Sequence, residues 1–205
     1  MAESTYECKL DKDLLSLLKS EMTQATYKYA HLYRYNNVAA PIAPDEKEAM
    51  IGKLQGGAGS FYRFLVDHVT EWEFNIFEMN DKASHLGGNA LIYLGYFLLW
   101  RHNLPAIFNL DEQKLVQWLE MVSAGYGTTE SNVTFHTNVH AADVLHAVHY
   151  MVTSSEGIKR LRLKDHHLLA IFLAAMMHDF SHLGVNNTFH TKTQTDLSSV
   201  FSDTS

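Results

Sequence analysis

Two clusters of histidine and aspartate in the C-terminal half of the chain could do chemistry. They comprise His136, His140 and Asp143 in the first cluster and His178, Asp179 and His182 in the second. Nine of the 13 histidines lie between residues 136 and 190. Histidine is the commonest metal ligand and exchanges protons near neutral pH. The clusters therefore favour a metal site.

The first cluster has the spacing of one helical face. His136 and His140 are four residues apart, and Asp143 follows three residues later. On a helix these positions share a face, so the imidazoles could bind a metal while Asp143 binds it or orients an imidazole. Thr137 replaces the glutamate of the metalloprotease signature, which excludes that class. The alternative is a helix face of solvated histidines.

The second cluster ends an apolar segment, which predicts a buried helix over residues 166–179. A charged Asp179 in such a place is costly unless it is paired or bound to a metal. His182 adds a third polar group four residues after His178. The alternative is that Asp179 bonds nearby amides at the helix end and His178 lies in the core.

Apolar periodicity predicts an all-α fold, because no alternating strand pattern of any length occurs. About seven to nine helices are expected. Asp11 is a candidate N-cap and Pro105 is expected to end a helical region. The predicted helices cover residues 11–33, 46–54, 60–79 with a turn near 71, 91–100, 111–124, 136–152 and 166–179.

Several large apolar residues are interpreted as core and not as a surface on which a base would stack. They are Trp72, Phe74, Phe97, Trp118, Met151, Met176 and Met177.

Composition excludes several classes of protein. The net charge of −7 does not support a nucleic-acid surface. The longest apolar run, residues 168–177, is half of the about twenty residues that span a bilayer, and the N-terminus lacks a secretory signal. Cys8 is the single cysteine, so no intramolecular disulfide forms. We therefore expect a cytoplasmic protein without a transmembrane segment.

The residues from His178 to Phe189 match a signature of a known family: His-Asp, an apolar residue, any residue, His, any residue, Gly, two residues, Asn, any residue and an apolar residue. The stretch from His136 to Val144 and residues 72–78 resemble two further blocks of the same family, in the same order. Over residues 70–200 the chain thus resembles the class I 3',5'-cyclic-nucleotide phosphodiesterases of the His-Asp (HD) metal hydrolase superfamily.

The resemblance implies a compact multi-helix catalytic domain, with residues 1–60 as a helical lead-in and 61–205 as the N-terminal portion of the domain. It implies two divalent ions, Zn²⁺ and Mg²⁺ (or Mn²⁺). His140, His178 and Asp179 would bind the tightly held ion, and Asp179 would bridge to the second. A homodimer is compatible with the family.

The implied reaction is hydrolysis of cyclic AMP or cyclic GMP to the 5'-monophosphate by a metal-activated hydroxide. His136 would contact the substrate and, as the general acid, protonate the leaving 3' oxygen. His182 would orient water around the second metal, and Asp143 would support the site from outside the ligand set.

Some residues depart from the family pattern. Thr137 stands where the family has Asn, Ser181 where it has Asp, Leu183 where it has Pro and Phe135 where it has Tyr. The resemblance also places a further Asp ligand, the glutamine that binds the purine and the walls of the base pocket after residue 205. Three alternatives therefore stay open: a non-catalytic or regulatory fragment, another hydrolase of the same superfamily, and a helical domain with incidental histidines.

Overall fold

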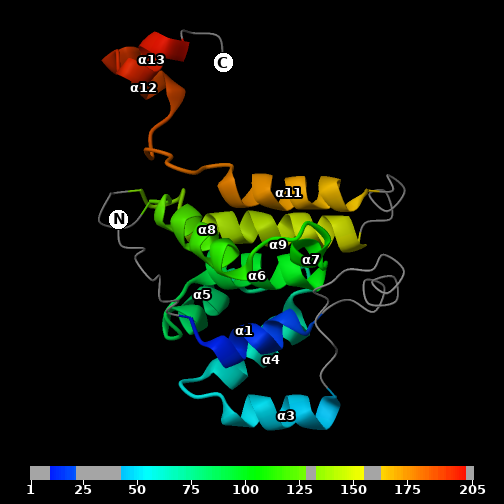
Figure 1. Ribbon diagram of the computed structural model, residues 1–205. Helices are drawn as coiled ribbons and strands as arrows, with labels where there is room; N and C mark the ends of the chain where they lie inside the picture. The colour runs from blue at the N-terminus through cyan, green and yellow to red at the C-terminus, as the bar shows by residue number, and fades with distance from the viewer. Residues whose placement is uncertain (1–9, 22–42, 128–132, 155–162, 202–205) are drawn as a thin grey trace, which may run out of the picture.

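The described parts of the chain consist of helices joined by turns and loops (Figure 1). The computed structural model describes residues 10–21, 43–127, 133–154 and 163–201. The helices in these ranges are α1 (Lys12–Lys19), α3 (Pro44–Lys53), α4 (Ala58–His68), α5 (Ile76–Ser84), α6 (Ala90–Arg101), α7 (Leu104–Ile107), α8 (Glu112–Ala124), α9 (Asn138–Ser154), α11 (Asp165–Met177), α12 (Asn187–Thr193) and α13 (Asp196–Phe201). The all-α prediction is confirmed for these residues. The short helices α7, α12 and α13 were not predicted.

Helix α6 lies at the centre of the core, and every residue from Ala90 to Trp100 is buried. Because α6 is apolar around its circumference, it needs neighbours on all sides. Helices α1, α5, α8, α9 and α11 pack against it. A Cβ atom at Gly95 would lie 2.8 Å from both Leu119 of α8 and Met176 of α11. Glycine at this position therefore lets both helices approach closely.

Helices α9 and α11 lie side by side and run in opposite directions (Figure 1). The start of α9 and the end of α11 are therefore at the same end of the pair. The first histidine cluster precedes and enters α9, and the second follows α11. This pairing brings together residues that are about forty positions apart in sequence.

The N-terminal helix α1 is shorter than expected. Asp11 is its N-cap, as predicted, and accepts hydrogen bonds from the amides of Asp13 and Leu14. The helix ends at Lys19, so the prediction of a longer helix is wrong at residues 20 and 21; residues 22–33 lie outside the described ranges. Residue 60, the expected domain boundary, lies inside α4.

Charged and hydroxyl groups connect α1 to the central helices. Lys19 of α1 pairs with Glu112 of α8 at 2.6 Å. The Tyr96 hydroxyl of α6 donates to the same carboxylate at 2.7 Å. The ammonium of Lys19 also lies over the Trp100 ring, 4.2 Å from its centroid. These contacts fix α1 against α6 and α8.

Some expected core positions are exposed. Trp72 is 62% exposed, because it lies in the turn between α4 and α5. Its ring packs on the ring of Tyr150, with centroids 5.2 Å apart. Met151 and Met177 are also exposed, so the core prediction is wrong for all three. It is confirmed for Phe74, Phe97 and Met176, while Trp118 is half-buried.

Pro105 does not end the helical region as expected. It lies in the first turn of α7. Proline is tolerated there because the amide hydrogen that it lacks has no partner within the helix.

Helix α11 is apolar over most of its length but is buried on one face only. Phe172, Ala175 and Met176 are buried, whereas Ala170 and Ala174 are exposed. The prediction of a buried helix over residues 166–179 is therefore wrong for the outer face. Across the described ranges, no helix combines the length and apolarity that crossing a membrane requires. The cytoplasmic location stays a prediction.

The buried His149 and the half-buried His102 lie away from the histidine clusters. His149 of α9 is 1% exposed, and the rings of His149 and His102 meet edge to face with centroids 5.4 Å apart. Neither nitrogen of His149 has a hydrogen-bond partner among the described residues. Burial lowers the pKa of His102 from 6.5 to about 4 and that of His149 to about 2; the charge of Arg101 acts in the same direction on both.

We expect the protein to lose stability in acid below about pH 6.5. Below that value the unfolded chain protonates both imidazoles while the folded chain keeps them neutral. The free energy of unfolding then falls by about 1.4 kcal/mol per pH unit for each histidine. The contribution of His102 to this loss of stability is complete near pH 4, whereas the contribution of His149 still grows at lower pH values.

Urea denaturation between pH 7 and pH 4 measures this loss. The variant His149→Gln should show a shallower decline, whereas the exposed control His85→Gln should follow the wild type. Equal slopes in all three proteins would contradict the assignment.

Candidate metal centre

Three ligand atoms converge where α9 and α11 meet. The Nε2 atom of His140 lies 3.2 Å from Nε2 of His178 and 3.4 Å from Oδ2 of Asp179. Nε2 of His178 lies 3.0 Å from the same oxygen. A tetrahedral Zn²⁺ ion with bonds of about 2.0–2.1 Å separates its ligand atoms by about 3.3 Å. The three residues therefore fit a divalent metal.

The surroundings of the two imidazoles suit metal binding. Nδ1 of His178 lies 2.9 Å from the carbonyl oxygen of Ala175. Since a carbonyl only accepts, Nδ1 carries the proton and Nε2 offers its lone pair. Burial, and then the neighbouring His178, lower the pKa of His140. The lowered pKa of His140 favours its neutral form at pH 7, and the hydrogen bond at Nδ1 of His178 leaves Nε2 of that ring available as a ligand.

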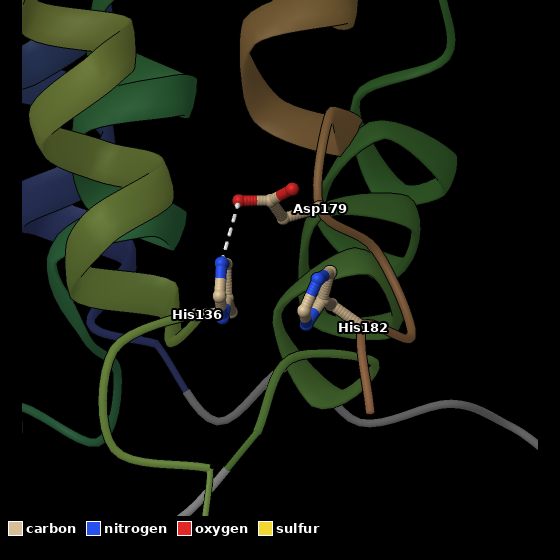
Figure 2. A group of neighbouring side chains, drawn as sticks. All are labelled: His136, Asp179 and His182. Carbon is tan, nitrogen blue, oxygen red and sulfur yellow. Dashed lines mark ion pairs between the residues drawn. The ribbon is translucent and has the colours of Figure 1, made fainter. Parts of the chain in front are cut away.

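A second group shares Asp179 and adds His136 and His182 (Figure 2). Nε2 of His136 lies 3.9 Å from Oδ2 of Asp179. The rings of His136 and His182 stack with centroids 3.7 Å apart and planes 24° apart. Potential ligand atoms of all three residues lie within 4.8 Å of one another.

The hydrogen bond at His182 separates its role from that of the other histidines. The amide of Gly184 donates to Nδ1 of His182 at 2.9 Å. Because Nδ1 accepts, the proton of the neutral ring is on Nε2, which then donates and has no lone pair for a metal. This geometry favours His182 as a hydrogen-bond donor.

Comparison with known proteins places the sequence in a family. The sequence pattern of the family described as 3'5'-cyclic nucleotide phosphodiesterase matches residues 135–205. The chain is 32% identical over 141 residues to 3',5'-cyclic-AMP phosphodiesterase 4 of Dictyostelium discoideum. It is also 32% identical over 137 residues to the human dual specificity calcium/calmodulin-dependent 3',5'-cyclic nucleotide phosphodiesterase 1C. The chain belongs to the cyclic nucleotide phosphodiesterase family.

The chain spans a small part of these phosphodiesterases. The two matches cover 69% and 67% of this chain, but 13% of the Dictyostelium protein and 18% of the human one. The bovine dual specificity calcium/calmodulin-dependent 3',5'-cyclic nucleotide phosphodiesterase 1B is 32% identical over 162 residues, which are 77% of this chain and 29% of the bovine protein.

Five of the six site residues predicted from the sequence come together, but not all as expected. Helix α9 begins at Asn138, so His136 precedes it and the expected helical face does not include His136. His136 reaches Asp179 from the preceding bend (Figure 2). Asp143 is exposed and lies outside both groups, although its charge acts on His140.

The alternative interpretation of the second cluster does not describe this geometry. Its carboxylate faces three imidazoles at 3.0 to 3.9 Å. The side chain of His178 is 33% exposed and is not a core residue. The carboxylate of Asp179 thus has imidazole partners within the candidate site.

Sequence reasoning missed the support that the residues after α8 give to this candidate site. The amide of Ser181 donates to the carbonyl of Gly125 at 2.9 Å. The hydroxyl of the buried Tyr126 contacts the residues flanking His178, and burial raises its pKa, so it stays protonated.

The backbone at Gly125 lies close to the ring of Phe180. A Cβ atom there would lie 2.0 Å from Cε2 of Phe180. Ser181 follows with φ of 61°, a left-handed conformation that costs energy in a residue other than glycine. The loop after α11 is thus docked against Gly125 with some backbone strain.

We expect Gly125→Ala to reduce the free energy of unfolding by about 1–3 kcal/mol, because the Phe180 ring has to move. Urea denaturation measures the change. The control Gly52→Ala lies in α3 with nothing within 4 Å of its Cβ position, and should be stabilising by about 0.5–1 kcal/mol. Unchanged stability in Gly125→Ala would show that the loop does not depend on this contact.

Proposed function

We propose that this chain carries a metal site for the hydrolysis of a 3',5'-cyclic nucleotide to its 5'-monophosphate. The convergence of His140, His178 and Asp179 beside His136 carries the proposal. Family membership supports the substrate class, since the relatives are named for cyclic AMP or for cyclic nucleotides of dual specificity. Cyclic AMP and cyclic GMP are both candidate substrates.

His140, His178 and Asp179 would hold the first metal, and a nitrogen-rich set suits Zn²⁺. Asp179 belongs to both groups of candidate ligands, so its carboxylate would also face a second ion such as Mg²⁺ or Mn²⁺. When bound, such ions lower the pKa of a coordinated water towards about 7 and offset phosphate charge.

His136 is assigned as the general acid. In the hydrolysis, an oxygen from water forms a bond to phosphorus and the bond between phosphorus and the 3' oxygen breaks. The leaving oxygen needs a proton, which Nε2 of His136 would supply. The stacked ring of His182 holds the plane of His136. The carboxylate of Asp179, at 3.9 Å, places negative charge near the proton before transfer.

His182 and Asp143 have supporting roles in this proposal. With its proton on Nε2, His182 would orient water or a phosphate oxygen as a donor, and its Nδ1 stays bonded to Gly184. Asp143 would act on His140 through its charge, one turn further along α9.

The test measures metal content and hydrolysis of cyclic AMP and cyclic GMP, with Zn²⁺ and Mg²⁺ added. We expect His140→Ala and Asp179→Ala to lose tight metal binding, because each removes a ligand. His136→Ala should keep the metal and lower turnover by about 10²–10⁴-fold, the usual contribution of a positioned acid. The control His166→Ala changes an exposed histidine at the start of α11 and should match the wild type.

The results separate the proposal from its alternatives. Equal metal loss in all three site variants would contradict the division between ligands and acid. A chain that binds metal but hydrolyses neither nucleotide would support a non-catalytic or regulatory fragment. A chain that binds no metal and has no activity would support the alternative of a helical domain with incidental histidines.

A further inference from the structure

We infer that Tyr126 positions the ligand pair His178 and Asp179, and that residues 125–127 form a brace between the two arms of the site. The arms are the segment before α9, which carries His136, and the segment after α11, which carries His182. The inference rests on the proposed metal site and adds a residue that belongs to neither histidine cluster.

The Tyr126 hydroxyl forms hydrogen bonds with backbone groups on both sides of His178. It donates to the carbonyl oxygen of Met176 at 2.8 Å and accepts from the amide of Asp179 at 3.4 Å. The last four carbonyl groups of an α-helix have no partner within the helix. Since α11 ends at Met177, the hydroxyl both satisfies such a carbonyl and holds the first turn beyond the helix.

Only a group that donates and accepts can make both contacts. A tyrosine hydroxyl does so, whereas phenylalanine keeps the ring and makes neither. The side chain of Tyr126 is 4% exposed, so its packing is that of a core residue. The hydroxyl can thus be removed while the packing of the ring is kept.

The neighbours of Tyr126 contact both arms. The carbonyl of Gly125 accepts from the amide of Ser181 at 2.9 Å, in the arm after α11. The amide of Gly127 donates to the carbonyl of His136 at 3.2 Å, in the arm before α9. Three consecutive residues at the end of α8 therefore set the separation between His136 and the residues that follow His178.

The site needs such a brace because its ligand atoms do not hold one another in place. The Nε2 atoms of His140 and His178 and Oδ2 of Asp179 lie 3.0 to 3.4 Å from one another, and as ligands of one metal ion each would direct a lone pair to the ion and not to its neighbour. Their positions have to be imposed by the surrounding chain, and supporting hydrogen bonds are the usual means.

The experiment compares Tyr126→Phe with the matched control Tyr93→Phe. The Tyr93 hydroxyl donates to the carbonyl of Leu86 at 2.7 Å, so the control removes a similar hydrogen bond away from the site. Zn²⁺ affinity is measured by calorimetry, and the absorption spectrum of bound Co²⁺ reports the ligand geometry. Amide hydrogen exchange at Asp179 is measured by NMR without metal.

We expect Tyr126→Phe to weaken Zn²⁺ binding by about 10-fold to 100-fold, the usual effect of losing a group that supports a ligand. The Co²⁺ spectrum should change, and the Asp179 amide should exchange about fivefold faster, as the loss of one hydrogen bond predicts. Tyr93→Phe should leave all three readouts unchanged.

Two results would overturn the inference: an Asp179 amide that exchanges at the wild-type rate in Tyr126→Phe, or equal loss of Zn²⁺ affinity in both variants, which would indicate general destabilisation. A wild-type chain that binds no Zn²⁺ would overturn the proposed metal site instead. The exchange rate at Asp179 would then still decide whether Tyr126 holds the turn.

Discussion

The burial of α6 is the constraint on which the arrangement of the other helices depends. A helix that is apolar on all sides has no face to turn towards water, so other helices have to surround it. Burying one large apolar side chain contributes about 1.5–3 kcal/mol, and α6 has eleven consecutive buried residues. The packing of α9 and α11 against this helix determines where their ends lie.

The polar site is built at those ends, where the helical hydrogen-bond pattern stops. Backbone groups without helical partners are available there, and the structure uses them: the carbonyl of Met176 binds Tyr126, and the amide of Gly184 sets the tautomer of His182. Ser181 has a left-handed backbone in the same loop. Local strain and converging polar atoms are features that functional sites contain and a stable core supports.

Local sequence patterns predicted the helices well where neighbours along the chain decide the outcome. The N-cap at Asp11 and the apolar helix around Gly95 depend on nearby residues. The start of α9 could also have been predicted from the sequence, because threonine is a common N-cap residue. The Thr137 hydroxyl accepts a hydrogen bond from the amide of His140 at 3.5 Å. Recognising it would have placed His136 outside the helix.

Features that depend on distant contacts could not be predicted in this way. Tyr126 meets its partner Met176 fifty residues later, and no local spacing indicates that contact. The apolar composition of α11 suggested burial, but burial depends on how many helices surround it. The spacing and the family resemblance named His140 and His178 as candidate ligands, but their meeting requires the antiparallel pairing of α9 and α11 (Figure 1).

The outer face of α11 has a consequence for the behaviour of the protein in concentrated solution. Ala170, Ala174 and Met177 form an apolar stripe on this face, and the contact of this stripe with water is unfavourable. Salts that are excluded from protein surfaces, such as ammonium sulfate, strengthen apolar association. The exposed stripe should therefore lower the solubility of the protein as sulfate is added, which a salting-out curve would show.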